Sequence, residues 1–265
     1  FRPAPEAFPR AKEAARKAMA LDPGLSGPYA ALGFAAFNYD WDFPEAEKQF
    51  REALQRNPNN AAARQWYAEL LHAWGRLAEA REEIDRAAEL DPFAMTVMDD
   101  KGWILVSQQE LDEAVRQFEA EAELNPQWPY AYYSLASACV YKRDFRKAHE
   151  ALARARAAGG ETARYLQVLG LAQAFGGETQ QARETLARLL ARPESERGPR
   201  YGLAAVYSGL GEKDAAIAVL EKALAERESW MVWLPVYPEW APLRGDARFQ
   251  GLLRRMNLAR AGDTQ

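Results

Sequence analysis

A small apolar residue recurs along the chain at a constant spacing. Alanine occupies six positions that are 34 residues apart, namely Ala46, Ala80, Ala114, Ala148, Ala182 and Ala216. A larger apolar side chain follows four residues after each, namely Phe50, Ile84, Phe118, Leu152, Leu186 and Leu220. A spacing of four residues puts both side chains on the same face of a helix. The pattern therefore predicts an amphipathic helix in every unit.

A second column of small residues lies upstream in each unit and predicts a second helix. Its members are Gly33, Ala68, Gly102, Ala136, Gly170 and Ala204. Glycine-containing turns such as Trp74-Gly75-Arg76 separate the two helices. Prolines close the first four second helices, at Pro23, Pro58, Pro92 and Pro126. Each unit thus reads as helix, tight turn, helix.

This spacing divides the chain into repeats. We expect a half repeat at 1–25, which is the second helix of a truncated unit, and a C-terminal cap at 231–265. The six units between them span 26–60, 61–94, 95–128, 129–162, 163–196 and 197–230. One extra residue lies in the turn Asn38–Asp42, and Asp246 is positioned to N-cap a last helix from Ala247 to about Leu258. Because the chain opens on half a repeat without an initiator Met, we expect more chain to precede it.

The column order and period resemble the tetratricopeptide repeat over roughly residues 7–230. The resemblance implies an all-α fold, a right-handed superhelical α-solenoid of helix-turn-helix units with a C-terminal capping helix. It also implies that the first helix of each unit lines a concave groove and that the second packs outside.

The tail and one turn carry a further resemblance. Residues 237–249, beginning Tyr237-Pro238-Glu239-Trp240, and the turn Tyr39-Asp40-Trp41-Asp42 are similar to tetratricopeptide regions at the C-terminus of multidomain bacterial proteins. The N-terminal portion of those proteins is a winged-helix domain, a serine/threonine kinase or an adenylate cyclase. The resemblance implies a role in signalling or transcription regulation.

The exposed positions of the first helices would decide what a groove binds, and many of them are aromatic. The candidate peptide-binding residues are Phe34, Phe37, Gln65, Trp66, Glu69, His72, Asp99, Asp100, Trp103, Tyr130, Tyr133, Tyr141, Phe175 and Tyr201. Exposed rings would form an apolar interaction patch, whereas buried rings would only fill gaps between helices. Both interpretations stay open for each ring.

The middle of this predicted groove is acidic. It lacks the Lys, Arg and Asn set with which chaperone-binding members of the family hold a terminal carboxylate. Glu69, Asp99 and Asp100 instead favour an apolar ligand that carries Lys or Arg. The alternative is that these carboxylates are simply solvated at a helix face.

Composition and charge narrow the functional classes. The formal net charge is −4 at pH 7, which argues against direct nucleic-acid binding. No apolar stretch is long enough for a membrane helix, and the single Cys139 fits a cytoplasmic protein and reads as a buried thiol. His72 and His149 have no nucleophile or carboxylate at motif spacing, and no metal or cofactor motif is present.

We therefore expect a non-catalytic scaffold that binds a protein or peptide in an aromatic groove and needs no cofactor. The alternative is a self-assembly module that forms a homo-oligomer through its end faces or its C-terminal cap. An enzyme would require a catalytic domain upstream of Phe1.

Overall fold

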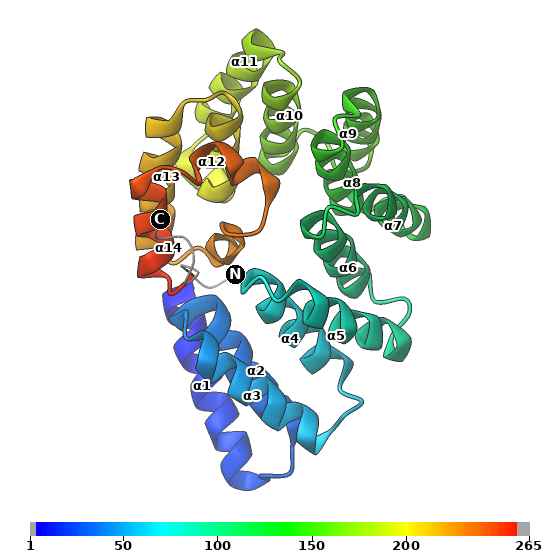
Figure 1. The fold of residues 1–265 in the computed structure, drawn as a ribbon, viewed down its shortest axis with the longest axis vertical. Helices are drawn as coiled ribbons and strands as arrows, with labels where there is room; N and C mark the ends of the chain where they lie inside the picture. The colour runs from blue at the N-terminus through cyan, green and yellow to red at the C-terminus, as the bar shows by residue number, and fades with distance from the viewer. Residues whose placement is uncertain (1–3, 259–265) are drawn as a thin grey trace. The chain divides into compact units, whose positions relative to one another are not determined.

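The computed structural model describes residues 4–258, and within that range the chain is built from helices with no strand (Figure 1). The all-α fold class predicted from the sequence is confirmed. Residues 1–3 of the predicted half repeat and 259–265 of the predicted cap lie outside the described residues.

After α1 (Ala4–Leu21), the helices come in pairs separated by tight turns. The first helices of the pairs are α2 (Ser26–Ala35), α4 (Ala61–Ala73), α6 (Met95–Ser107), α8 (Pro129–Tyr141), α10 (Ala163–Phe175) and α12 (Arg200–Gly209). The second helices are α3 (Phe43–Arg56), α5 (Leu77–Leu90), α7 (Leu111–Leu124), α9 (Phe145–Gly159), α11 (Thr179–Leu190) and α13 (Lys213–Ala225). The repeat boundaries derived from the sequence remain a prediction.

The chain forms two compact units. The N-terminal unit contains the described residues of 4–100, 232–236 and 253–258, and the C-terminal unit contains 101–231 and 237–252. Within the N-terminal unit, the first helices α2 and α4 pack against each other. Within the C-terminal unit, α8 packs on α10 and α10 on α12, so neighbouring first helices share one face.

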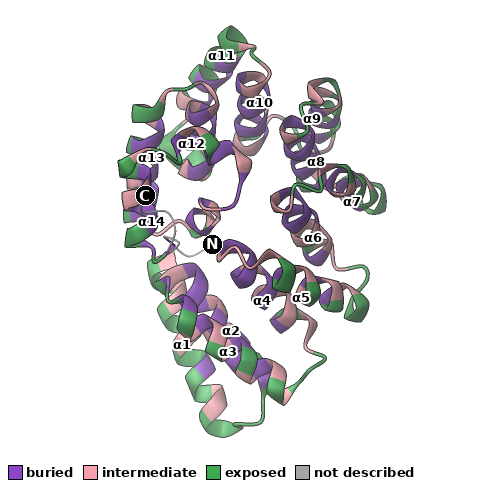
Figure 2. Ribbon diagram, viewed as in Figure 1, coloured by how far each residue is buried: buried purple, intermediate pink, exposed green. Residues whose placement is uncertain are grey.

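The two small-residue columns form the core between the helices of each pair. All six alanines of the 34-residue column are fully buried, and buried positions lie on the sides where helices meet (Figure 2). A Cβ added to Gly102 would lie only 2.3 Å from Cε1 of Phe118 on the second helix. The small residue is needed there because a large ring from the partner helix occupies the space.

Several helices end where the prolines in the sequence predict. The first four second helices, α1, α3, α5 and α7, each end two residues before their proline, as predicted. The extra residue near Asp40 is taken up by a π-helical turn, Ala36–Asp40, in which the Trp41 N–H bonds the Ala36 carbonyl. Trp41 then adopts a left-handed conformation, with φ 57°, which ends the helix.

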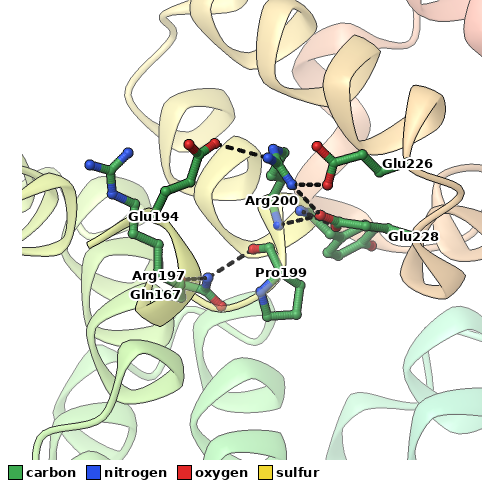
Figure 3. Close-up of polar contacts among 8 residues, drawn as sticks. Gln167, Glu194, Arg197, Pro199, Arg200, Glu226 and Glu228 are labelled. Carbon is green, nitrogen blue, oxygen red and sulfur yellow. Dashed lines mark hydrogen bonds and ion pairs between the residues drawn. The ribbon is translucent and has the colours of Figure 1, made fainter. Parts of the chain in front are cut away.

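A longer connection, residues 191–199, joins α11 to α12 and is tied down by polar side chains (Figure 3). Nε2 of Gln167 donates to the backbone carbonyls of Arg197 and Pro199, both at 2.9 Å. The carboxylate of Glu228 accepts the backbone N–H of Arg200 at 3.1 Å, which satisfies a free donor at the start of α12. Arg200 also pairs with Glu194 at 2.9 Å.

The C-terminal segment consists of two short 3-10 helices, η3 (Ser229–Trp233) and η4 (Pro238–Leu243), followed by α14 (Ala247–Arg255). Oδ1 of Asp246 accepts the backbone N–H of Arg248 at 2.9 Å, as expected of an N-cap. Arg248 holds the pKa of Asp246 at about 2. The last helix is three residues shorter than predicted, because Asn257 turns left-handed with φ 58° and the Leu258 N–H bonds the Leu253 carbonyl.

Candidate functional site

The candidate residues from the sequence differ widely in burial. Those that are buried are Phe37, His72, Trp103, Tyr133 and Tyr201. Those that keep part of their surface exposed are Phe34, Gln65, Trp66, Glu69, Asp99, Asp100, Tyr141 and Phe175, and Tyr130 is 53% exposed. The buried rings fill gaps between helices, so the two interpretations of the aromatic residues apply to different members of the set.

In the N-terminal unit, four partly exposed rings follow one another across α1, α2, the π-helical turn Ala36–Asp40 and α4. The ring of Phe8 stacks on Tyr39 at a centroid distance of 5.1 Å and lies 6.3 Å from Phe34. Phe34 in turn lies 4.9 Å from Trp66. We call Phe8, Phe34, Tyr39 and Trp66 the ring ladder. Lys12 borders it, with its ammonium 2.8 Å from the Asp40 carboxylate.

Packing beneath the ladder holds Trp66 in place. Trp66 contacts a buried cluster of Tyr29, Ala30, Ala53 and Ala63, so only part of the indole faces outward. A ring that is fixed on one side and exposed on the other can contact a ligand with little loss of conformational entropy.

Carboxyl groups lie beside Trp66 on α4 and α6. Glu69 and Asp100 share a hydrogen bond, and Nε2 of Gln65 donates to Oδ2 of Asp100 at 2.7 Å. Burial, reinforced by the charge of Asp99, raises the pKa of Glu69 to about 7. Burial and the charges of Glu69 and Asp99 raise the pKa of Asp100 well above its usual value. Both pKa shifts favour the protonated form of these carboxyls relative to ordinary surface acids.

In the C-terminal unit, the chain's own tail covers the first-helix face. The ring of Tyr237 lies 4.7 Å from that of Trp103 on α6. The hydroxyls of Tyr141 on α8 and Tyr201 on α12 donate to the two carboxylate oxygens of Glu239, at 2.6 and 3.1 Å. Three of the predicted groove residues are thus occupied by residues 237–239.

Several polar groups under this tail form hydrogen bonds with one another. The indole N–H of Trp240 donates to the Tyr201 hydroxyl at 2.7 Å, and Oγ of Ser208 donates to the Glu239 backbone carbonyl at 2.7 Å. Burial raises the pKa of Glu239, and the hydrogen bonds from Tyr141 and Tyr201 oppose that rise. Burial and the nearby Glu239 charge raise the pKa values of both tyrosines well above the usual value.

The remaining candidates lie in separate places. Tyr130 packs edge-on against Tyr133, whose hydroxyl is 3.1 Å from Oγ1 of Thr162. Phe175 fills the space beside Gly209.

Phe37 and His72 are both core residues of the N-terminal unit that contact Trp233. Burial lowers the pKa of His72 to about 3, so its imidazole is neutral.

Sequence reasoning missed several members of both sites. Phe8 and Tyr39 complete the ring ladder, but they lie in the half repeat and in the π-helical turn, where the 34-residue columns give no register. The sequence indicated Glu239 and Trp240 only through the similarity of residues 237–249 to other tetratricopeptide regions. A carboxylate between two aromatic residues in a proline-rich tail is the signal that could have identified them.

Cys139 and His149 are the other residues that the sequence analysis weighed for chemistry. Cys139 is buried, as predicted, and burial raises its thiol pKa to about 11. Nε2 of His149 lies 3.2 Å from a carboxylate oxygen of Glu178. Across residues 4–258, His, Cys, Asp and Glu form no group of three or more that could hold a metal ion, and none of the helices found there is both long and apolar enough to cross a membrane.

Comparison with protein families agrees with this organisation. The sequence pattern of the family described as tetratricopeptide repeat matches residues 42–95, and a second pattern with the same description matches 200–229. The sequence has no significant match among curated proteins.

Solved structures share the fold at low sequence identity. A chain from a functional characterisation of Pseudomonas aeruginosa pilF is 23% identical, with a TM-score of 0.56 over 72% of this chain and 87% of that one. YrrB, described as a TPR protein with an unusual peptide-binding site, is 15% identical, with a TM-score of 0.50 over 79% and 99% of the two chains.

A third structure extends over more of this chain. A chain of the APC/C hetero-tetramer Cut9-Hcn1 is 17% identical, with a TM-score of 0.61 over 94% of this chain and 52% of that one. This chain therefore spans about half of that chain's length. The two family patterns lie within the helix pairs described above, and these structures share the fold. Residues 42–95 and 200–229 are thus tetratricopeptide-repeat sequences, and the chain shares its fold with these solved structures.

Proposed function

We propose that this chain is a non-catalytic scaffold that binds an apolar, basic peptide or segment of a partner protein on the ring ladder of its N-terminal unit. Tetratricopeptide repeats generally bind protein or peptide partners, and YrrB is described as having a peptide-binding site. The ladder supports placing the ligand on this unit, because its rings are fixed by packing and still partly exposed.

The acidic cluster next to Trp66 supports the basic character of the ligand. A Lys or Arg side chain lying beside Trp66 would meet Glu69, Asp99 and Asp100. Binding a cation there favours ionised Glu69, whose pKa is about 7 without ligand. The affinity for a basic peptide should therefore increase from pH 6 to pH 8.

Selection from a random library of displayed 12-residue peptides would test this proposal. We expect the recovered peptides to combine aromatic or aliphatic residues with Lys or Arg. A fluorescein-labelled recovered peptide should bind at least tenfold more weakly to Phe34→Ala and Trp66→Ala, since buried aromatic contacts dominate such interfaces. Phe175→Ala removes a partly exposed ring from the other unit and should leave binding unchanged.

The proposal is wrong if the Phe34→Ala and Trp66→Ala chains keep a native circular dichroism spectrum and full affinity. It is also wrong in its charge preference if the recovered peptides are acidic.

We also propose that the scaffold belongs to a larger bacterial regulatory protein in the cytoplasm. The likeness of the tail and of the turn at Tyr39–Asp42 to such proteins supports this context. Sequencing the coding region upstream of Phe1 tests it, and a coding region that begins at Phe1 would contradict it.

A further inference from the structure

The segment 237–243 contacts the C-terminal unit in the manner of a bound peptide. Its contacts come from first helices far apart in the sequence, through Trp103 of α6, Tyr141 of α8 and Tyr201 of α12. They involve both a side chain and a backbone carbonyl of the segment, since Ser208 bonds the Glu239 carbonyl oxygen. Peptide recognition commonly combines main-chain hydrogen bonds with pockets for selected side chains.

Glu239 is the centre of these contacts. Two tyrosine hydroxyls donate to its carboxylate, and Trp240 donates to one of those hydroxyls, so every donor in the chain of hydrogen bonds points toward Glu239. The Trp240 ring also meets the Tyr201 ring edge-on at 4.9 Å. The face thus provides matched positions for a carboxylate and for the indole that follows it.

The segment packs closely onto the part of the face formed by Trp103, Tyr141 and Tyr201. The side chains of Trp240 and Leu243 are fully buried, and Glu239 is 4% exposed. The cavity that remains among Tyr141, Tyr201 and Glu239 has a volume of about 20 Å³, which leaves room for about one water molecule.

We propose that residues 237–243 are an intramolecular ligand of the C-terminal unit and keep its first-helix face closed to other partners. The face recognises a short 3-10 helical segment in which a carboxylate lies between aromatic residues, as in Tyr237-Pro238-Glu239-Trp240. Of the ring ladder and the first-helix face of the C-terminal unit, only the ring ladder is then available to a partner of the intact protein.

A labelled synthetic peptide of residues 235–245 tests this inference on the full chain. Trp240→Ala weakens the chain's own segment while leaving Tyr141 and Tyr201 in place. We expect the peptide to bind the Trp240→Ala chain and not the unsubstituted chain, as measured by fluorescence anisotropy. A peptide with Gln in place of Glu239 should bind about tenfold more weakly, because it loses hydrogen bonds to a charged acceptor.

Two further variants keep the test decisive. Glu239→Ala opens the face by a different change and serves if Trp240→Ala lacks a native circular dichroism spectrum. Trp66→Ala alters the ring ladder only, so its C-terminal face should stay closed and bind no peptide.

Three results would overturn the inference. In the first, the peptide binds the unsubstituted chain as tightly as the Trp240→Ala chain. In the second, the peptide binds neither Trp240→Ala nor Glu239→Ala although the variant is natively folded. In the third, the Gln-containing peptide binds as tightly as the original peptide. A dimer of the unsubstituted chain held together by exchanged tails, detected by light scattering, would also contradict it. None of these outcomes bears on the ring ladder, so the inference and the proposed function fail independently.

Discussion

Single side chains set the chemistry of both faces through their burial. On the N-terminal unit, the pKa values of Glu69 and Asp100 are raised because both carboxyls are partly buried and Asp99 adds a like charge. On the C-terminal unit, Glu239 is more deeply buried, at 4% exposed, but it accepts hydrogen bonds from two hydroxyls. The two glutamates therefore have different surroundings, because Glu69 is repelled by a like charge and Glu239 is supplied with hydrogen-bond donors.

Glu69 should make the stability of the protein depend on pH. The pKa of Glu69 is about 7 in the folded chain and 4.5 for an ordinary glutamate, which represents the unfolded chain. Protonation of Glu69 therefore adds to the free energy of unfolding below pH 4.5, and this stabilisation is lost as the pH rises to 7. Glu69→Gln should therefore stabilise the protein at pH 8 by roughly 3 kcal/mol, given about 1.4 kcal/mol for each unit by which the pKa is raised. The gain should disappear at pH 4. Urea unfolding at both pH values measures it.

Glu79→Gln is the matched control for this prediction. The hydrogen bond to Arg76 lowers the pKa of Glu79. Ionised Glu79 therefore stabilises the folded chain above its unfolded pKa, and this stabilisation is lost as the pH falls. A gain of the same size at pH 8 in both variants would show that burial of Glu69 is not the cause.

At the scale of elements, the connections between repeats need different supports. The early repeats end on prolines that stop their second helices, whereas the connection 191–199 depends on Gln167 and on the charged side chains around Arg200 (Figure 3). Gly202 belongs to the same arrangement, because a Cβ there would lie 2.2 Å from Oε1 of Gln167. A side chain of α10 thus determines both the path of this connection and the residue type at the start of α12.

Replacing Gln167 should loosen this connection. Gln167→Leu removes the donor to the carbonyls of Arg197 and Pro199, and each hydrogen bond lost costs about 0.5–1.5 kcal/mol. We expect faster tryptic cleavage after Arg197 and a lower midpoint of urea unfolding. Gln180→Leu on the exposed face of α11 should change neither. Unchanged cleavage in Gln167→Leu would mean that the arginine contacts alone hold the segment.

At the scale of the whole molecule, each repeat relies on its neighbours to cover its apolar face. Within each unit the contacts join a helix to its pair and to the adjacent pair, as expected of a repeat array. The stability of such an array is a sum of local terms, so damage to one repeat should be felt mainly nearby.

Matched substitutions in the two units test this locality. Phe50 and Phe118 are both fully buried on second helices, and truncation of either to Ala should cost about 3–5 kcal/mol. Native-state hydrogen exchange should show lost protection around α2–α5 in Phe50→Ala and around α6–α9 in Phe118→Ala. If either variant loses protection evenly throughout the chain, the array unfolds as one cooperative body instead.

The sequence by itself determined the helix pairs, the small-residue core and the proline-marked helix ends. These depend on residues that are close in the chain or that repeat at a constant spacing, so one unit predicts the next. The extra residue near Asp40 was also visible, although its π-helical form was not.

Only the tertiary structure decided which rings are exposed and what covers them. The columns place Tyr141 and Tyr201 on first helices, but they carry no information about a tail segment that returns to those helices from outside the repeat. Likewise, Phe8 meets both Phe34 and Tyr39 because α1 packs beside α2. Burial depends on such long-range contacts, and that is why the repeat pattern could predict the fold but could not separate the covered face from the ring ladder.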